Sequence, residues 1–179
     1  SGFAVHGNSV GGLERPYRVG CVRVVNAARR SAQHAEVGQQ ALQAGMHHDG
    51  MQFFPLPIGS NNSTHGLLVM NHEYVDENML STEGVRVNSA EKVKKAMHAV
   101  GVSVVEVTLE SNGWRVVRPS RYARRIHGRT PIRIAGPAAG ADMMKTAADP
   151  TGRAMFGTFA GCAHGWTPWG TYLTCEENF

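Results

Sequence analysis

The stretch "VSVVEVTLESNGWRVVRP" (102–119) decides the fold class. Within residues 105–109, apolar side chains alternate with Glu106 and Thr108, which is the two-residue period of a half-buried β-strand. The tripeptide at 111–113, Ser-Asn-Gly, predicts a hairpin turn, and residues 114–119 predict the returning strand. This part of the chain therefore indicates antiparallel β-structure.

The segment just before it, "NSAEKVKKAMHAVG" (88–101), has a different period and predicts a helix. Asn88 is a suitable N-cap, and Glu91, three residues later, completes a capping box. Gly101 stands where a helix is expected to end. The predicted apolar face consists of Val93, Ala96, Met97 and Val100.

Several further short apolar runs predict strands. The runs "GMQFFPLP" (50–57) and "LLVMNHEY" (67–74) flank a loop of Gly, Ser and Asn residues, which predicts a second hairpin. Residues 27–45 read as a loop or a weak helix. The other predicted strands are 17–25, 130–137, 154–162 and 169–177. Many short strands with one inserted helix fit a sandwich, a barrel or propeller blades, and periodicity alone does not choose between them.

Composition limits the class of protein. A chain of 179 residues fits one domain, and its formal net charge is +4. It contains 3 cysteines, an odd number, so at least one thiol is free, buried or bound to a metal. No segment approaches the ~20 apolar residues that cross a bilayer, so we expect no membrane span.

Residues 115–133 form a run rich in arginine. Such a run can bind phosphate or nucleic acid, or it can be the solvated edge of a hairpin, where charge discourages aggregation. Trp114 and Tyr122 are the aromatic residues at hand, too few for a base-stacking platform. We therefore expect no nucleic-acid partner.

The stretch "GCAHGWTPWGTYLTCEENF" (161–179) gathers reactive side chains. Cys162 is predicted in a glycine-flanked turn, and a short strand then delivers Cys175, Glu176 and Glu177. Thiolate is a soft ligand and carboxylate a hard one, so the combination suits iron, with calcium on the oxygen side. A Cys162–Cys175 disulfide across a hairpin and a solvated strand end are the alternatives. In a regular strand Glu176 and Glu177 face opposite ways, unless a bulge re-aims one of them.

The segment "MNHEY" (70–74) ends an apolar strand. Asn71 and Glu73 fall on one strand face and His72 on the other, so an amide oxygen and a carboxylate form half of a calcium shell. The alternative is an ordinary solvated strand end. For His47-His48-Asp49, before the first strand of this hairpin, we predict a loop with hydrogen-bonding roles.

These blocks together resemble a known family. "HHDGMQFFPLP", "LLVMNHEY", "TPIRIAGPAAGADMMKT" and "GTFAGCAHGWTPWGTYLTCEENF" resemble, in this order, the PhoX-type alkaline phosphatases from about His47 to Phe179. The resemblance implies a six-bladed β-propeller with inserted segments, an Fe(III) and Ca²⁺ cluster, and hydrolysis of small phosphate monoesters. It also implies export by the twin-arginine route to the periplasm or the cell exterior.

The resemblance also implies roles for single residues. Cys162 would bind iron, and Glu73 would bind the cluster with Asn71 close by. Glu176 and Glu177 lie where the family keeps metal-binding carboxylate. Asp142 and His164 are expected behind these ligands. Ala141 departs from the family pattern, where a polar residue is expected.

The resulting prediction is a mainly β protein, part of a six-bladed β-propeller with one inserted helix near 88–100. Residues 1–45 would form an N-terminal arm and first strand, and residues 46–179 the N-terminal part of a catalytic propeller domain. We expect a fragment that needs the rest of the propeller as its partner. The expected function is a metal-dependent phosphomonoesterase, and the alternative is a non-catalytic β-domain that binds calcium or a partner.

Overall fold

The two apolar runs around the Gly/Ser/Asn loop form a β-hairpin, as predicted. In the computed structural model, which describes residues 3–4, 37–86 and 88–177, strands β2 (His48–Pro55) and β3 (His65–His72) pair antiparallel. Phe54 lies opposite Leu67. The register shifts between His48 and Met51, so a bulge interrupts the start of β2.

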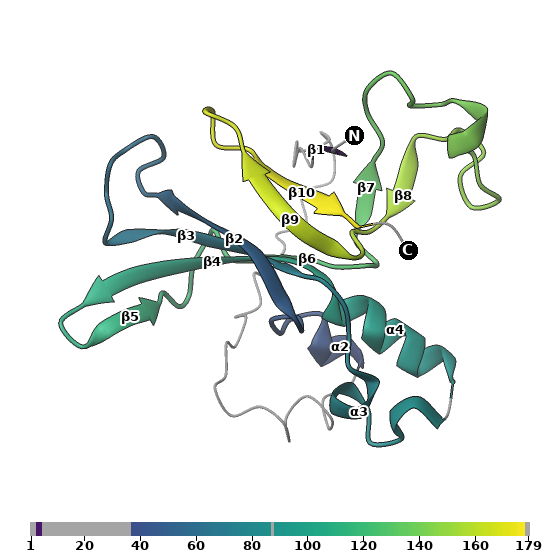
Figure 1. The fold of residues 1–179 in the computed structure, drawn as a ribbon, viewed down its shortest axis with the longest axis horizontal. Helices are drawn as coiled ribbons and strands as arrows, with labels where there is room; N and C mark the ends of the chain where they lie inside the picture. Colours follow the sequence, from purple (N-terminus) through teal and green to yellow (C-terminus); the bar gives the residue numbers. More distant parts are fainter. Residues whose placement is uncertain (1–2, 5–36, 87, 178–179) are drawn as a thin grey trace.

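The stretch that decides the fold class extends this hairpin into a wider sheet (Figure 1). Strand β4 (Gly101–Glu110) pairs antiparallel with β3 along its whole length. A tight turn leads to β5 (Gly113–Val116), which pairs with the end of β4. Strand β6 (Arg124–Ile126) pairs with the beginning of β4 on the same edge. The strand at 102–110 and its hairpin are thereby confirmed.

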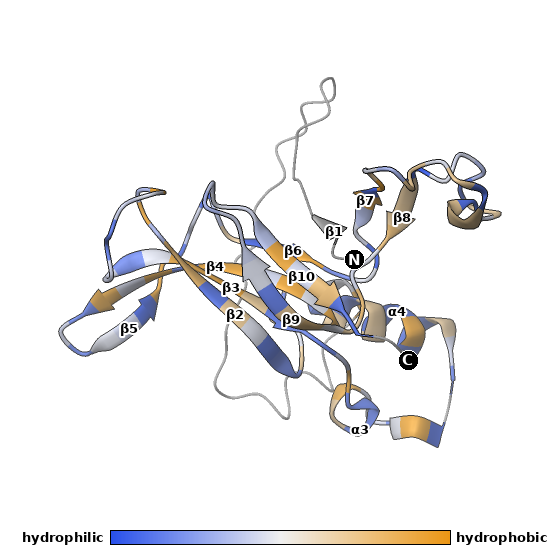
Figure 2. Cartoon of the chain, turned by 45° about the horizontal axis from the view of Figure 1, so that its top comes forward, coloured by the Kyte–Doolittle hydropathy of each residue, from blue (hydrophilic) through white to orange (hydrophobic). Residues whose placement is uncertain are grey.

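The core lies on this sheet. It consists of Phe54, Leu56, Leu67, Val69, Val102 and Val104. Tyr122, Ile126 and Tyr172 pack against it from neighbouring segments. Figure 2 shows hydrophobic residues along β3 and β4, and the loops are largely hydrophilic. Burial of these apolar side chains stabilises the sheet by about 25 cal/mol per Å² removed from water.

A second antiparallel sheet lies against β2. Its order is β1 (Phe3–Ala4), β10 (Tyr172–Glu176) and β9 (Gly161–Trp166). The tip of the β9–β10 hairpin approaches the β2–β3 loop, since a Cβ built on Gly170 would lie 3.5 Å from Ile58. A third, two-stranded sheet of β7 (Pro131–Arg133) and β8 (Ala154–Phe156) carries a long connection with the 3-10 helix η2 (Asp142–Met144).

The helices gather beside the main sheet (Figure 1). The longest is α4 (Ala90–Ala99), inside the predicted range. Short helices α2 (Val37–Gln40) and α3 (Glu77–Leu80) and the 3-10 helix η1 (Gly84–Arg86) accompany it, so α4 is not the single helix that the sequence predicted. No helix among the described residues is long and apolar enough to cross a membrane.

Two details of the predicted helix are wrong. Its N-cap is Ser89, whose side chain accepts a hydrogen bond from the Lys92 main-chain N–H at 3.2 Å. Its buried face includes Lys92 and Lys95, and Val93 is exposed. The Lys95 ammonium donates to the Leu80 carbonyl at 2.7 Å, at the end of α3, so the buried lysine satisfies a helix terminus.

The chain around residue 160 also differs from the prediction. The expected strand at 154–162 is two elements, β8 and the start of β9, and the expected glycine-flanked turn at 161–165 lies within β9. Cys162 and Cys175 are both free thiols, so the alternative of a disulfide between them is wrong for this structure. The predicted strand at 17–25 lies outside the described residues.

Candidate metal centre

Three side chains from distant parts of the chain converge at the junction of the two larger sheets. A carboxylate oxygen of Asp49, one of Glu73 and the Cys162 sulfur all lie within 4.8 Å of one another. Asp49 and Glu73 come from the β2–β3 hairpin, and Cys162 comes from β9. We call these three residues the acid–thiol cluster.

The hairpin itself brings the two carboxylates together. Because β2 and β3 are antiparallel, the first residues of β2 lie beside the last residues of β3. The Glu73 main-chain N–H donates to the His47 carbonyl at 3.0 Å, just beyond the paired region. The register shift between His48 and Met51 spans Asp49, whose carboxylate oxygen lies within 4.8 Å of one of Glu73.

The backbone is strained just before two members of the cluster. His47 has φ of 47° and Ala160 has φ of 46°, values that residues other than glycine rarely adopt. The His47 ring stacks on Tyr74 with centroids 3.8 Å apart, which holds that turn in place. Strain of this kind costs of order 1–3 kcal/mol and is concentrated at functional sites.

Electrostatics around Cys162 favour a cation. A hydrogen bond to Asp49, burial, and the negative charges of Asp49, Glu73 and Glu177 raise the pKa of the Cys162 thiol to about 11. The same charges that disfavour a thiolate would stabilise a positive ion placed among them. The cluster thus combines one potential thiolate with carboxylate oxygens around a common point.

The predicted ligands Glu176, the last residue of β10, and Glu177, which follows it, make different contacts. Glu177 lies close enough to Cys162 for its charge to raise the pKa of the thiol. The Glu176 carboxylate accepts a hydrogen bond from the Phe159 main-chain N–H at 3.1 Å, on the segment leading into β9. The β9–β10 register shifts between Thr174 and Glu176, the kind of bulge that can re-aim neighbouring side chains.

Asn71 is completely buried, and its amide is engaged on both sides. Its Nδ2 donates to the carbonyl oxygens of Cys162 at 3.0 Å and Ala163 at 3.2 Å. Its Oδ1 accepts a hydrogen bond from the Tyr172 hydroxyl at 3.0 Å. Asn71 therefore contacts the main chain of the cluster's cysteine.

His164 and Asp142 lie in different surroundings. The His164 ring stacks against Tyr172, with centroids 5.9 Å apart, beside the cluster. Asp142 belongs to η2 in the β7–β8 connection, and its 95% exposed carboxylate pairs with Lys145 at 2.7 Å. Asp142 is thus tied to its own loop.

Sequence reasoning missed Asp49 and Tyr172. The sequence predicts a loop at Asp49, although a hairpin of 50–57 with 67–74 brings residues 49 and 73 to the same end of the hairpin. Tyr172 lies on a predicted strand, and burial together with the charges of Asp49 and Cys175 raises the pKa of its hydroxyl. No sequence signal indicated its contact with Asn71, which depends on how the two sheets meet.

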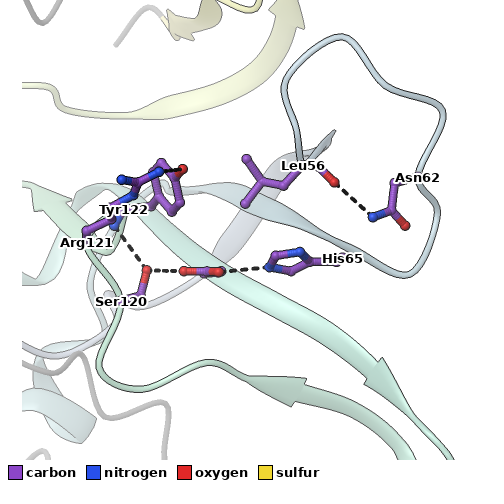
Figure 3. A network of polar contacts seen from close by, with 7 residues as sticks. Leu56, Asn62, His65, Ser120, Arg121 and Tyr122 are labelled. Atoms are coloured by element: carbon purple, nitrogen blue, oxygen red, sulfur yellow. Dashed lines mark hydrogen bonds and ion pairs between the residues drawn. The ribbon is translucent and has the colours of Figure 1, made fainter.

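A second polar network lies in a different place (Figure 3). The Glu106 carboxylate accepts hydrogen bonds from the Ser120 hydroxyl and from His65, the latter at 2.8 Å. It borders a cavity of about 700 Å³ lined by Leu56, Pro57, His65, Glu106, Val117, Pro119, Ser120, Arg121 and Tyr122. No member of the acid–thiol cluster lines this open cavity, so its size does not identify it as the reactive site.

The donor set of the acid–thiol cluster fits a transition-metal ion. One sulfur and two carboxylates within a few ångströms can serve as ligands of iron, and the carboxylate side suits calcium. Glu177 adds a third negative charge nearby. On this chemistry, the residues present fit the cations that the resemblance implies.

Known proteins resemble this chain in sequence and in fold. The family described as "Alkaline phosphatase PhoX" matches residues 23–179. Among solved structures, Pseudomonas fluorescens PhoX in complex with vanadate, a transition state analogue, is 47% identical with a TM-score of 0.76. The match covers 83% of this chain and 25% of that protein, so this chain spans about a quarter of its length. A search of curated proteins finds no match. The chain belongs to the PhoX family of alkaline phosphatases.

Proposed function

We propose that this chain contributes part of the metal centre of a phosphomonoesterase, and that Asp49, Glu73 and Cys162 hold a cation there. The observation that carries the proposal is the convergence of one thiol and two carboxylates within 4.8 Å. A 47% identical PhoX binds vanadate, a transition state analogue, which supports a phosphate ester as the substrate.

The chemistry of the donors suggests the kind of ion. We assign Fe(III) to the Cys162 side of the cluster and Ca²⁺ to the carboxylate side, because sulfur prefers the softer ion. When bound, such cations supply the positive charge that stabilises the transition state of phosphoryl transfer. Asp49, Glu73 and Glu177 supply the negative charge that attracts them.

The remaining expected ligands are proposals of different kinds. Glu177 is proposed as a ligand because its charge acts on Cys162. Glu176 is proposed at the rim, because its carboxylate already holds the Phe159 N–H. The ligand role expected for Asn71 stays a prediction, and the hydrogen bonds of its amide favour a positioning role.

The larger architecture is part of the same proposal. Antiparallel sheets of this kind are compatible with blades of the expected six-bladed propeller. Family membership supports export and the rest of a propeller as partner. An N-terminal arm over residues 1–45 and a catalytic domain from residue 46 stay predictions, and the family match begins at residue 23. Because the chain spans a quarter of the P. fluorescens protein, we take cation binding as the first readout and turnover as the second.

The test compares Cys162→Ser with Cys175→Ser. Both changes replace a cysteine by serine, so they are chemically identical. They differ in place, because Cys162 lies in the cluster and Cys175 is the exposed thiol of the neighbouring strand. We expect Cys162→Ser to lose bound iron, measured by elemental analysis after loading with Fe(III) and Ca²⁺, and to lose any p-nitrophenyl phosphate hydrolysis. Cys175→Ser should keep both. Equal iron content in the two variants would contradict the proposal, and cation binding without turnover would favour the non-catalytic alternative.

A further inference from the structure

The side chains of Asn71 and Tyr172 connect β2, β3 and β9, the strands that bring the acid–thiol cluster together. Asn71, fully buried on β3, donates to the Cys162 carbonyl on β9 at 3.0 Å. The Tyr172 hydroxyl, on β10, lies 3.0 Å from Asn71 Oδ1 and 2.9 Å from the Gly50 carbonyl oxygen on β2. We call these two residues the Asn71–Tyr172 pair.

Each member of the cluster is close in sequence to one of these contacts. Asp49 precedes Gly50, Glu73 follows Asn71 by two residues, and the contacted carbonyl belongs to Cys162 itself. A shift of β9 relative to β2 and β3 would break these hydrogen bonds. Buried polar groups that lose their partners cost about 1–3 kcal/mol each, so the arrangement resists such a shift.

We infer that the Asn71–Tyr172 pair positions the acid–thiol cluster, setting the spacing of Asp49, Glu73 and Cys162 that a cation requires. The inference rests on the proposed function and adds residues that act through the ligands. Groups that orient metal ligands typically contribute 10–100-fold to metal affinity. The pair holds main-chain atoms beside the ligands, where a small displacement moves the whole ligand side chain.

The alternative role for Asn71 is direct ligation, and the aspartate variant separates the two. In Asn71→Asp the Nδ2 donors are lost, and a carboxylate would face the carbonyl oxygens of Cys162 and Ala163. Positioning therefore predicts weaker cation binding. Ligation predicts equal or tighter binding, because a carboxylate is at least as good a ligand as an amide.

The second variant removes a single hydroxyl. Tyr172→Phe keeps the ring that packs on Phe54 and His164. It loses the hydroxyl, whose one proton is shared between the acceptor oxygens of Asn71 and Gly50. Tyr122→Phe is the matched control, because Tyr122 also packs against the core and its hydroxyl accepts a hydrogen bond from Arg121 away from the cluster. Both variants remove one oxygen from a partly buried tyrosine.

The experiment titrates the whole chain with cobalt(II) and follows the cobalt–thiolate absorption, which reports ligation by cysteine. We expect Tyr172→Phe and Asn71→Asp to weaken cobalt binding by at least about tenfold, and Tyr122→Phe by less than about twofold. Urea denaturation of the metal-free proteins checks folding. Wild-type affinity in Tyr172→Phe, or equal or tighter binding in Asn71→Asp, would overturn the inference.

A second readout needs no metal. Cys162 is half-buried, so loosening of β9 in metal-free protein should make its side chain more accessible. Iodoacetamide should therefore alkylate Cys162 several-fold faster in Tyr172→Phe than in the wild type. The exposed Cys175 serves as the internal reference. If the wild type binds no cation but Cys162 alkylation accelerates, the proposed function fails while the positioning contacts stand. An unchanged alkylation rate would overturn the positioning role itself.

Discussion

Gly50 and Cys162 touch through their main chains. A Cβ built on Gly50 would lie 2.8 Å from the Cys162 carbonyl oxygen and 2.9 Å from the His164 Cβ. Real Cβ atoms essentially never approach so closely. The close approach of β2 to β9, on which the acid–thiol cluster depends, therefore requires glycine at position 50.

The first prediction follows from this contact. We expect Gly50→Ala to push β9 away from β2, to lower the free energy of unfolding by about 1–3 kcal/mol through overpacking, and to weaken cation binding. Gly38→Ala is the control, because a Cβ at Gly38, on α2, meets no atom within 4 Å. Urea denaturation and cobalt(II) titration of both variants check the prediction, and wild-type behaviour of Gly50→Ala would contradict it.

The local part of the candidate site was predictable from sequence. Both hairpins have strong signals, and an antiparallel pairing of 50–57 with 67–74 implies that Asp49 and Glu73 are neighbours. The approach of Cys162 was not predictable, because it depends on contacts between strands more than eighty residues apart in sequence. Only the resemblance to a known family predicted that Cys162 and Glu73 belong to one metal site.

For helix α4, the sequence predicted the element correctly but not the face that is buried. Its existence was clear from periodicity, but its buried face was not, because Lys92 and Lys95 find main-chain carbonyl partners on η1 and α3. A lysine stem can pack against apolar surface while its ammonium bonds locally. A pattern that counts lysine as exposed therefore predicts the wrong buried face and places Val93 on it, whereas Val93 is exposed in the structure.

The second prediction concerns the start of this helix. Ser89→Ala removes the hydroxyl that accepts the Lys92 N–H, so we expect a loss of about 1 kcal/mol in the free energy of unfolding. Asn88→Ala, one residue earlier, should change that free energy by less than about 0.5 kcal/mol. Thermal and urea denaturation of the two variants compare the caps, and a larger effect at Asn88 would restore the cap expected from sequence.

The third prediction concerns Arg125, whose guanidinium joins several elements through main-chain carbonyls. Its acceptors are Gln43, His98, Val100, Val102 and Ile126, at 2.7–3.1 Å. The His98 and Val100 carbonyls lie at the end of α4, where carbonyl groups lack helical partners. We expect Arg125→Met to lower the free energy of unfolding by about 3 kcal/mol or more, because buried acceptors lose a charged donor.

Arg124→Met is the matched control for this change. Arg124 is the neighbouring residue of β6 and donates one bond of 3.4 Å, to the Tyr122 carbonyl. Its replacement should change the free energy of unfolding by less than about 0.5 kcal/mol. Arg125→Lys should fall between the two, because an ammonium offers three donors where a guanidinium offers five. Equal urea midpoints for Arg124→Met and Arg125→Met would refute the prediction.

The last prediction concerns pH and the Glu106 network. Burial alone would raise the pKa of Glu106, but hydrogen bonds from Ser120 and His65 and the charges of His65 and Arg121 outweigh it and lower the pKa. A lowered folded-state pKa stabilises the protein above the unfolded carboxyl pKa, about 4.3, and this contribution is lost as pH falls through the folded value. We therefore expect the stability difference between wild type and Glu106→Gln to be largest near neutral pH and to shrink below about pH 4.

Glu110→Gln, at the exposed end of the same strand, should show little pH-dependent difference. Urea midpoints measured between neutral and acidic pH decide the matter: a difference between wild type and Glu106→Gln that stays constant would show that the Glu106 charge contributes nothing to stability.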